Sequence, residues 1–257
     1  MKLTITMMMA LFVGIGLAVG PAFAALSESI VNGDLETDDI GGGDNFYPGG
    51  GYVAPAGPTG WSTGENQTSL TRLTNTTTSG ILPTPWQIMY TGFDWATNTA
   101  GDKVWSFQSL GTVDITDQGL SFSFSADGVA NKKIALSDHY GGEVEASFRT
   151  GVTGGDNGVE IGSSSEWSFG SNVDTGGLFN STGDATYAPT SADIGKEIFV
   201  VVSSTVTNAT TNAAEQGPGI GWDDAVLGVI GTRTVIPEPA TLTLLGVGGL
   251  TVLRRRR

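Results

Sequence analysis

The stretch LSFSFSA, Leu120–Ala126, decides the fold class of this chain. Every second residue in it is apolar (Leu120, Phe122, Phe124 and Ala126), and the three residues between them are serines. Because successive side chains of a strand point to opposite faces, this alternation predicts a β-strand with one buried face.

Other stretches have the same character. In EVEASFR, residues 143–149, the pattern points Val144, Ala146 and Phe148 inward, and Glu143, Glu145, Ser147 and Arg149 outward. EIFVVVSSTVT, residues 197–207, is almost continuously apolar, as a central strand would be. GDKVWSFQSLG (101–111) and NKKIALSDHYGG (131–142) are further candidate strands. No convincing amphipathic helix lies between residues 25 and 232, so the sequence predicts an all-β sandwich or barrel.

Glycine is frequent between the predicted strands. The chain has 39 glycines in 257 residues, without a collagen-like period. Two stretches rich in Gly, Ser, Asn and Asp, residues 38–60 and 153–184, are predicted to be long loops or insertions, or to carry hairpins too short to recognise.

Charge and composition exclude several function classes. The net charge is −14 at pH 7, there is no cysteine, and His139 is the single histidine. These facts exclude thiol catalysis, cysteine-zinc sites and a centre of several histidines. Without the terminal segments, seven basic and 25 acidic residues remain, a net charge near −18. Nucleic acid is therefore not an expected partner, because phosphate binding needs clustered Lys and Arg.

The N-terminus is typical of a secretory signal peptide. Lys2 precedes an apolar run, and Ala22-Phe23-Ala24 supplies small residues at the cut. We expect residues 1–24 to engage the secretion machinery and to be removed after Ala24; an uncleaved membrane anchor is the alternative.

The C-terminal sequence predicts a short hydrophobic segment that holds the chain in the membrane temporarily. An apolar stretch of 14 residues, 240–253, precedes four arginines, Arg254, Arg255, Arg256 and Arg257. As a short hydrophobic helix this stretch would span ~21 Å, less than the ~30 Å of a bilayer core. The arginines favour the cytoplasmic side, which would leave the preceding body outside the inner membrane.

Pro237, Glu238 and Pro239, the apolar run and the arginine tail together resemble the PEP-CTERM sorting signal. The two prolines keep this approach non-helical. The resemblance implies an exosortase-type processing enzyme as a partner, a Gram-negative bacterium that builds an exopolysaccharide matrix, and a destination in the envelope or extracellular matrix. The same tail occurs on some ice-binding proteins.

The edges of residues 25–232 resemble galactose-binding-like jelly rolls of carbohydrate-binding modules. The resemblance rests on IVNGDLE (30–36), on Gly60-Trp61 and on GIGWDDAVLGVI (219–230), although Leu35 and Ala225 depart from the usual residues. It implies a jelly-roll β-sandwich body, followed by a sorting tail at residues 233–257.

That family often carries a structural calcium that ties its first strand to its last. The resemblance carries this site over to Asp34, Glu36, Asp223 and Asp224, whose oxygens suit calcium. Acidic residues that only cap strands are the alternative.

Aromatic residues are the candidate ligand site. Trp61 and Trp222 are expected to be structural, whereas Trp86, Tyr90 and Trp95 are candidates for stacking against sugar rings. Ser137, Asp138 and His139 are too close in sequence for a catalytic relay. The sequence therefore predicts a non-enzymatic exported protein, with polysaccharide as a candidate ligand. A matrix component without a specific ligand, a secreted glycan hydrolase or lyase, and an ice-binding protein are the alternatives.

Overall fold

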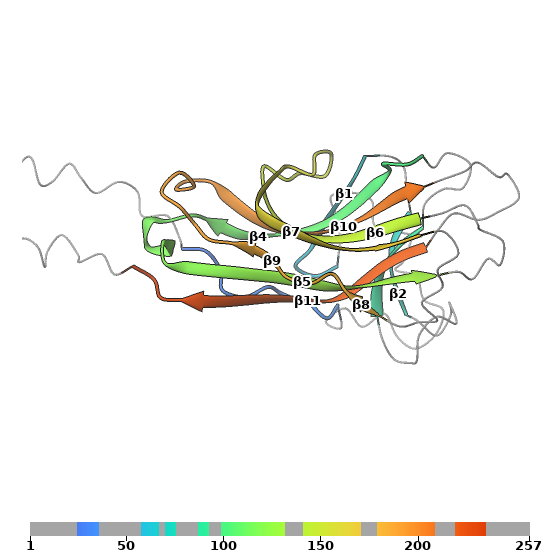
Figure 1. Ribbon diagram of the computed structural model, residues 1–257, viewed down its shortest axis with the longest axis horizontal. Helices are drawn as coiled ribbons and strands as arrows, with labels where there is room; N and C mark the ends of the chain where they lie inside the picture. Colours follow the sequence, from blue (N-terminus) through green and yellow to red (C-terminus); the bar gives the residue numbers. More distant parts are fainter. Residues whose placement is uncertain are drawn as a thin grey trace, which may run out of the picture.

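Two antiparallel sheets pack face to face (Figure 1). The computed structural model describes residues 25–35, 58–66, 70–75, 87–92, 99–131, 141–170, 179–208 and 219–234. The first sheet, here the β6 sheet, contains in spatial order β1 (Ser62–Glu65), β4 (Lys103–Thr112), β10 (Glu197–Asn208), β6 (Gly141–Thr150) and β7 (Val159–Phe169). The second, here the β5 sheet, contains β9 (Ala185–Tyr187), β5 (Leu120–Asn131), β11 (Gly219–Gly231), β3 (Gln87–Gly92) and β2 (Leu70–Asn75).

Three smaller features complete this architecture. Strand β8 (Asn180–Ser181) pairs with β5, and the 3₁₀ helix η1 (Ile115–Asp117) joins β4 to β5. One pair, Ser163 with Thr186, links β7 to β9 and so joins the two sheets along one side. The predicted all-β jelly-roll sandwich is confirmed.

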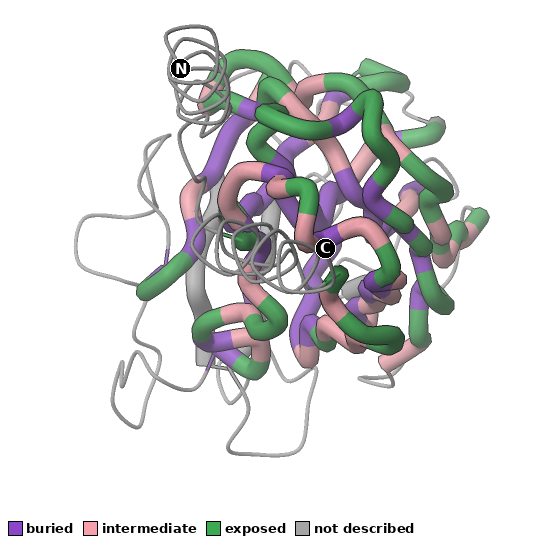
Figure 2. Tube along the Cα trace, turned by 90° about the vertical axis from the view of Figure 1, so that its left-hand side faces the viewer, coloured by how far each residue is buried: buried purple, intermediate pink, exposed green. Residues whose placement is uncertain are grey.

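The core lies between the sheets and is built by the predicted alternation. Phe122 and Phe124 of β5 are at most 1% exposed, and Phe148 of β6 is fully buried. The Phe148 ring lies 6.4 Å from that of Phe122 and 6.1 Å from that of Phe124, both edge-on. Along β5, buried residues alternate with half-buried ones from Leu120 to Gly128; Figure 2 colours the chain by this burial.

The outer face of the β6 sheet is more buried than the pattern predicts. Glu145 and Ser147 were expected to face solvent, yet they are 7% and 0% exposed. A second apolar cluster covers part of this face, made of Trp105, Phe107, Val152, Phe199 and Val201. The prediction that residues 197–207 form a central strand is confirmed, because β10 lies between β4 and β6.

The prediction of a loop over residues 153–184 is wrong in its central part. Strand β7 occupies 11 of these residues and pairs with β6. The opening stretch also differs from its expected strand, since Ile30–Leu35 forms bends and turns with positive φ at Asn32 (53°) and Leu35 (58°).

Both predicted targeting segments lie outside the described residues, namely residues 1–24 and 235–257. In the part of the chain that the structure describes, no helix has the length and apolar character needed to cross a membrane.

Candidate functional site

The predicted sugar-stacking residues lie mostly outside the described residues. Trp86 and Trp95 are not described, and Tyr90 is described only through its backbone in β3, opposite Gly221 of β11. Their role as a sugar platform stays a prediction.

Three of the four described tryptophans are structural. Trp61, Trp105 and Trp222 are 4%, 2% and 1% exposed. The rings of Trp61 and Trp222 lie 5.0 Å apart, and the Trp61 indole donates to the carbonyl oxygen of Asn32 at 3.0 Å. The prediction that Trp61 and Trp222 are core residues is confirmed.

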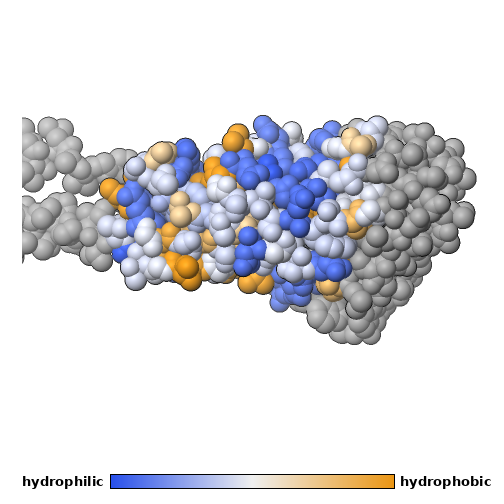
Figure 3. Space-filling view, viewed as in Figure 1, coloured by the Kyte–Doolittle hydropathy of each residue, from blue (hydrophilic) through white to orange (hydrophobic). Residues whose placement is uncertain are grey.

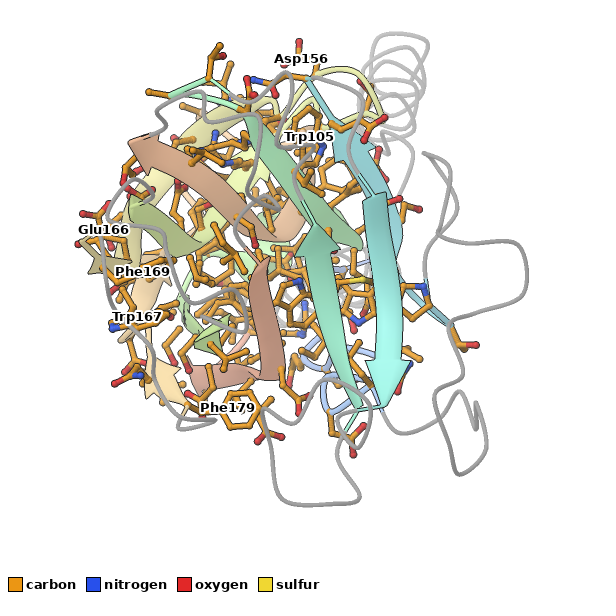
Figure 4. All side chains as sticks on the ribbon, turned by 90° about the vertical axis from the view of Figure 1, so that its right-hand side faces the viewer. Trp105, Asp156, Glu166, Trp167, Phe169 and Phe179 are labelled. Atoms are coloured by element: carbon orange, nitrogen blue, oxygen red, sulfur yellow. The ribbon has the colours of Figure 1, made fainter. Side chains whose placement is uncertain are left out.

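Trp167 is different, because it keeps part of its surface exposed at the end of β7. Its ring lies 5.1 Å from that of Phe169, with an angle of 31° between the two planes. Figure 4 shows both side chains at the left of the molecule, with the partly exposed Phe179 at the bottom of the view. Strand β7 pairs with β9 at Ser163, where the two sheets join, and continues beyond this seam to Phe169. We call Trp167 and Phe169, which lie beyond the seam, the seam pair.

Two glycines allow the seam pair to pack closely on the sandwich. A Cβ at Gly128 of β5 would come within 2.7 Å of the Trp167 ring, and one at Gly142 of β6 within 2.4 Å of the Phe169 ring. Each ring therefore packs against backbone on one side, and the partial exposure of both rings leaves aromatic surface available to a ligand.

Three carboxylates lie near this end of β7, one each on β5, β6 and β7. Glu166 is exposed and, being adjacent to Trp167, points to the outer face of the sheet. Burial, followed by repulsion from Glu166, raises the pKa of Glu143 above its usual value. Burial also raises the pKa of Asp127 on β5, against the effect of its hydrogen bond with Ser181. Such oxygens can accept hydrogen bonds from sugar hydroxyls.

Glu145, further along the same outer face, is already paired. Lys103 Nζ lies 3.2 Å from its Oε2, and Arg149 Nη2 lies 2.6 Å from its Oε1. Burial alone would raise the pKa of Glu145, but the two cations outweigh it and lower that pKa. These contacts stabilise the sheet itself, so we assign Glu145 a structural role.

The segments proposed to hold calcium come together through their backbones. Ala225 donates its N–H to the Gly33 carbonyl at 2.9 Å, beside a bulge in β11. Asp223 is 1% exposed and its Oδ1 accepts the Asp224 N–H at 2.8 Å, while Asp34 is exposed. Glu36 lies outside the described residues, and among those described no three His, Asp or Glu side chains are arranged to hold a metal.

The acidic oxygens at this junction are of the type that calcium prefers, and they come from both ends of the body. A complete set of calcium ligands would nevertheless need Glu36 or loop carbonyls as well. The calcium site stays a prediction. Ser137, Asp138 and His139 also lie outside the described residues.

Sequence reasoning missed the seam pair because it lies in the Gly- and Ser-rich stretch. The signal was present in SEWSFG, where Trp167 and Phe169 alternate with Glu166 and Ser168. Only four residues alternate there, which is short for a strand prediction.

A comparison with protein-family models finds a match at the C-terminal tail. Residues 235–257 match the PEP-CTERM protein-sorting motif, which confirms the interpretation of the tail. No curated protein sequence is similar to the chain.

The solved structures to which this chain is similar match it at low sequence identity and at TM-scores below 0.5. The enzymatically active domain of bacteriophage CBA120 tailspike protein 4 is 11% identical over 79% of this chain, with a TM-score of 0.42; this chain spans 21% of its length. The CBM22-2 xylan-binding domain of Paenibacillus barcinonensis Xyn10C is 9% identical over 68% of this chain and 92% of its own, with a TM-score of 0.37. A family 11 carbohydrate-binding module of a Clostridium thermocellum cellulase is 14% identical over 74% and 95%, with a TM-score of 0.30.

Proposed function

We propose that this chain is an exported protein of the cell envelope or extracellular matrix whose β-sandwich binds polysaccharide without cleaving it. The sorting motif at residues 235–257 supports export and processing by an exosortase-type enzyme. In this proposal the secretion machinery removes residues 1–24, and residues 240–253 hold the body at the outer face of the inner membrane until processing.

The partial exposure of Trp167 is the observation that carries polysaccharide binding. An aromatic ring that packs on one face and is open on the other offers an apolar surface to the C–H face of a sugar ring. Phe169 extends this surface at a centroid distance of 5.1 Å. Trp86, Tyr90 and Trp95 remain proposed additions to the ligand surface.

The proposed role is non-catalytic. One buried glutamate, Glu145, is held by Lys103 and Arg149, which makes it a poor proton donor.

Binding of a polysaccharide panel by the wild type and two variants tests this proposal. We expect Trp167→Ala to lose at least tenfold in affinity. Val159→Ala, an exposed apolar truncation at the other end of the same strand (68% exposed), should bind like the wild type. Thermal melting checks that both variants are folded.

Three results would contradict the proposal. The absence of binding to any polysaccharide would favour a matrix component without a specific ligand. Reducing-sugar release would favour a hydrolase, and release of unsaturated sugar ends a lyase. Equal affinity of Trp167→Ala and wild type would remove the seam pair from the ligand site, and Trp86→Ala and Trp95→Ala would then be compared.

A further inference from the structure

The first and last described segments meet at one end of the sandwich, here called the tail pole (left in Figure 1). Asp117, at the end of η1, is fully buried there. Its carboxylate accepts the Leu26 N–H at 3.2 Å and the Asp114 N–H at 2.8 Å, and it pairs with the Arg233 guanidinium. Arg233 also donates to the Leu26 carbonyl at 2.6 Å.

The chain remains fixed up to the residue before the sorting motif. Thr234 donates its N–H to the Thr116 carbonyl at 2.8 Å, and the motif begins at residue 235. Leu26, at the other end, lies two residues after the predicted signal cleavage. The tail pole therefore fixes both points at which the folded body meets its targeting segments.

Three exposed isoleucines lie on the segments that form this pole. Ile115, Ile194 and Ile230 are 45%, 39% and 73% exposed. Their segments are hydrogen-bonded to one another: Gly195 donates to Val113 at 2.9 Å, and Thr234 bonds to Thr116. Apolar atoms are visible at this end of the described surface (Figure 3).

Ion pairs reduce the cost of removing water from this pole. Arg233 pairs with both Asp117 and Glu28, and Lys196 Nζ lies 2.9 Å from Asp193. Paired charges next to exposed apolar side chains suit the interface of a membrane better than isolated carboxylates do, because isolated charges are costly to desolvate.

The sequence sets how far this pole can lie from a membrane. Six Cα–Cα steps separate Thr234 from Ala240, the first residue of the apolar segment. Fully extended, they reach about 20 Å. An inserted segment would thus keep Thr234 within about 20 Å of the membrane, which allows Ile115, Ile194 and Ile230 to reach the lipid headgroups.

We propose that the tail pole is a lipid-contact surface, on which the body rests through Ile115, Ile194 and Ile230 while the C-terminal segment is in the membrane. This rests on the part of the proposed function that inserts the tail, and is independent of polysaccharide binding. The opposite end of the sandwich, with the seam pair, then faces away from the membrane.

The absence of cysteine makes the contact directly measurable. Ile115→Cys, Ile194→Cys and Ile230→Cys are each labelled with a polarity-sensitive fluorophore in the chain that retains its tail. The labelled chains are then reconstituted into phosphatidylcholine vesicles. We expect a blue shift of the emission at all three positions. Ala100→Cys, an exposed residue at the opposite end, should give no shift. A chain that ends at Thr234 should give none at any position.

Each other outcome overturns the proposal in a recognisable way. Co-sedimentation with vesicles without a blue shift would show that the pole does not touch lipid, leaving tail insertion intact. Failure of the tailed chain to co-sediment would remove both tail insertion and lipid contact. A shift that depends on protein concentration and not on vesicles would identify contact between two copies of the chain.

Discussion

The tail pole and the seam pair lie at opposite ends of one sandwich and use their side chains in opposite ways. At the tail pole, the Asp117 carboxylate is surrounded by donors from this chain: Leu26, Asp114 and Arg233. At the seam, Trp167 and Phe169 pack against glycine backbone on one side and keep partial exposure on the other. A group whose contacts are all internal stabilises the fold, whereas a group packed on one side also has surface for a ligand.

The largest expected effect comes from removing the buried carboxylate at the tail pole. Asp117→Ala should lower the free energy of unfolding by about 3–5 kcal/mol, because it leaves the partly buried Arg233 guanidinium and the Leu26 N–H without their acceptor. Urea unfolding of residues 25–234 measures this. Glu28→Gln, at a partner whose side chain is 53% exposed, is the control and should cost about 0.5 kcal/mol or less. Equal costs for the two variants would show that the tail pole is not held by Asp117.

Calcium, if bound as predicted, would tie the N-terminal segment to β11 at a second place. Free calcium at 100 times its dissociation constant should stabilise the body by about 2.7 kcal/mol. For a body of this size that corresponds to roughly 5–10 °C in melting temperature.

Scanning calorimetry in calcium and in chelator measures this shift. Asp34→Asn, at an exposed position, should reduce the shift between its own melts in calcium and in chelator. Identical melts of the wild type in both buffers would rule the site out; the backbone hydrogen bond from Ala225 to Gly33 would still join the two segments.

Glycine substitutions beside the seam pair test whether the Trp167 ring is the ligand platform. Gly128→Ala should displace the Trp167 ring, since the new Cβ would lie 2.7 Å from it, and should cost about 1–3 kcal/mol of stability. It should also weaken polysaccharide binding if the ring is the platform. Gly170→Ala is a matched control next to Phe169, where an added Cβ has nothing within 4 Å. Unchanged binding by a folded Gly128→Ala protein would argue against the seam pair.

The sequence predicts the fold far better than it predicts these two regions. Alternation in Leu120–Ala126 and the apolar run of β10 follow from burial alone, so the sandwich could be inferred. Strand β7 could not, because Gly162 and three serines (163–165) interrupt any apolar pattern. The Asp117–Arg233 pair joins residues 116 positions apart, and no local spacing reveals such a contact.

The smallest expected effect on stability concerns two glutamates on the outer face of β6, Glu143 and Glu145. Lys103 and Arg149 hold the pKa of Glu145 below its ordinary value despite burial. Its ionised form therefore stabilises the fold above about pH 4.3, and this contribution is lost as the pH falls through the depressed pKa. Burial and Glu166 raise the pKa of Glu143, so its ionisation destabilises the fold as the pH rises through the raised value.

The two neutral variants should therefore change stability in opposite directions. At pH 7, Glu145→Gln should lose about 1–2 kcal/mol, and Glu143→Gln should become slightly more stable. Both differences should shrink towards pH 3, where the carboxyl groups of the wild type are largely protonated. Urea unfolding at the two pH values measures them. A loss of stability in Glu143→Gln at pH 7 would mean that this carboxylate is held by partners as Glu145 is. Glu143 would then belong with the internally paired groups of the molecule.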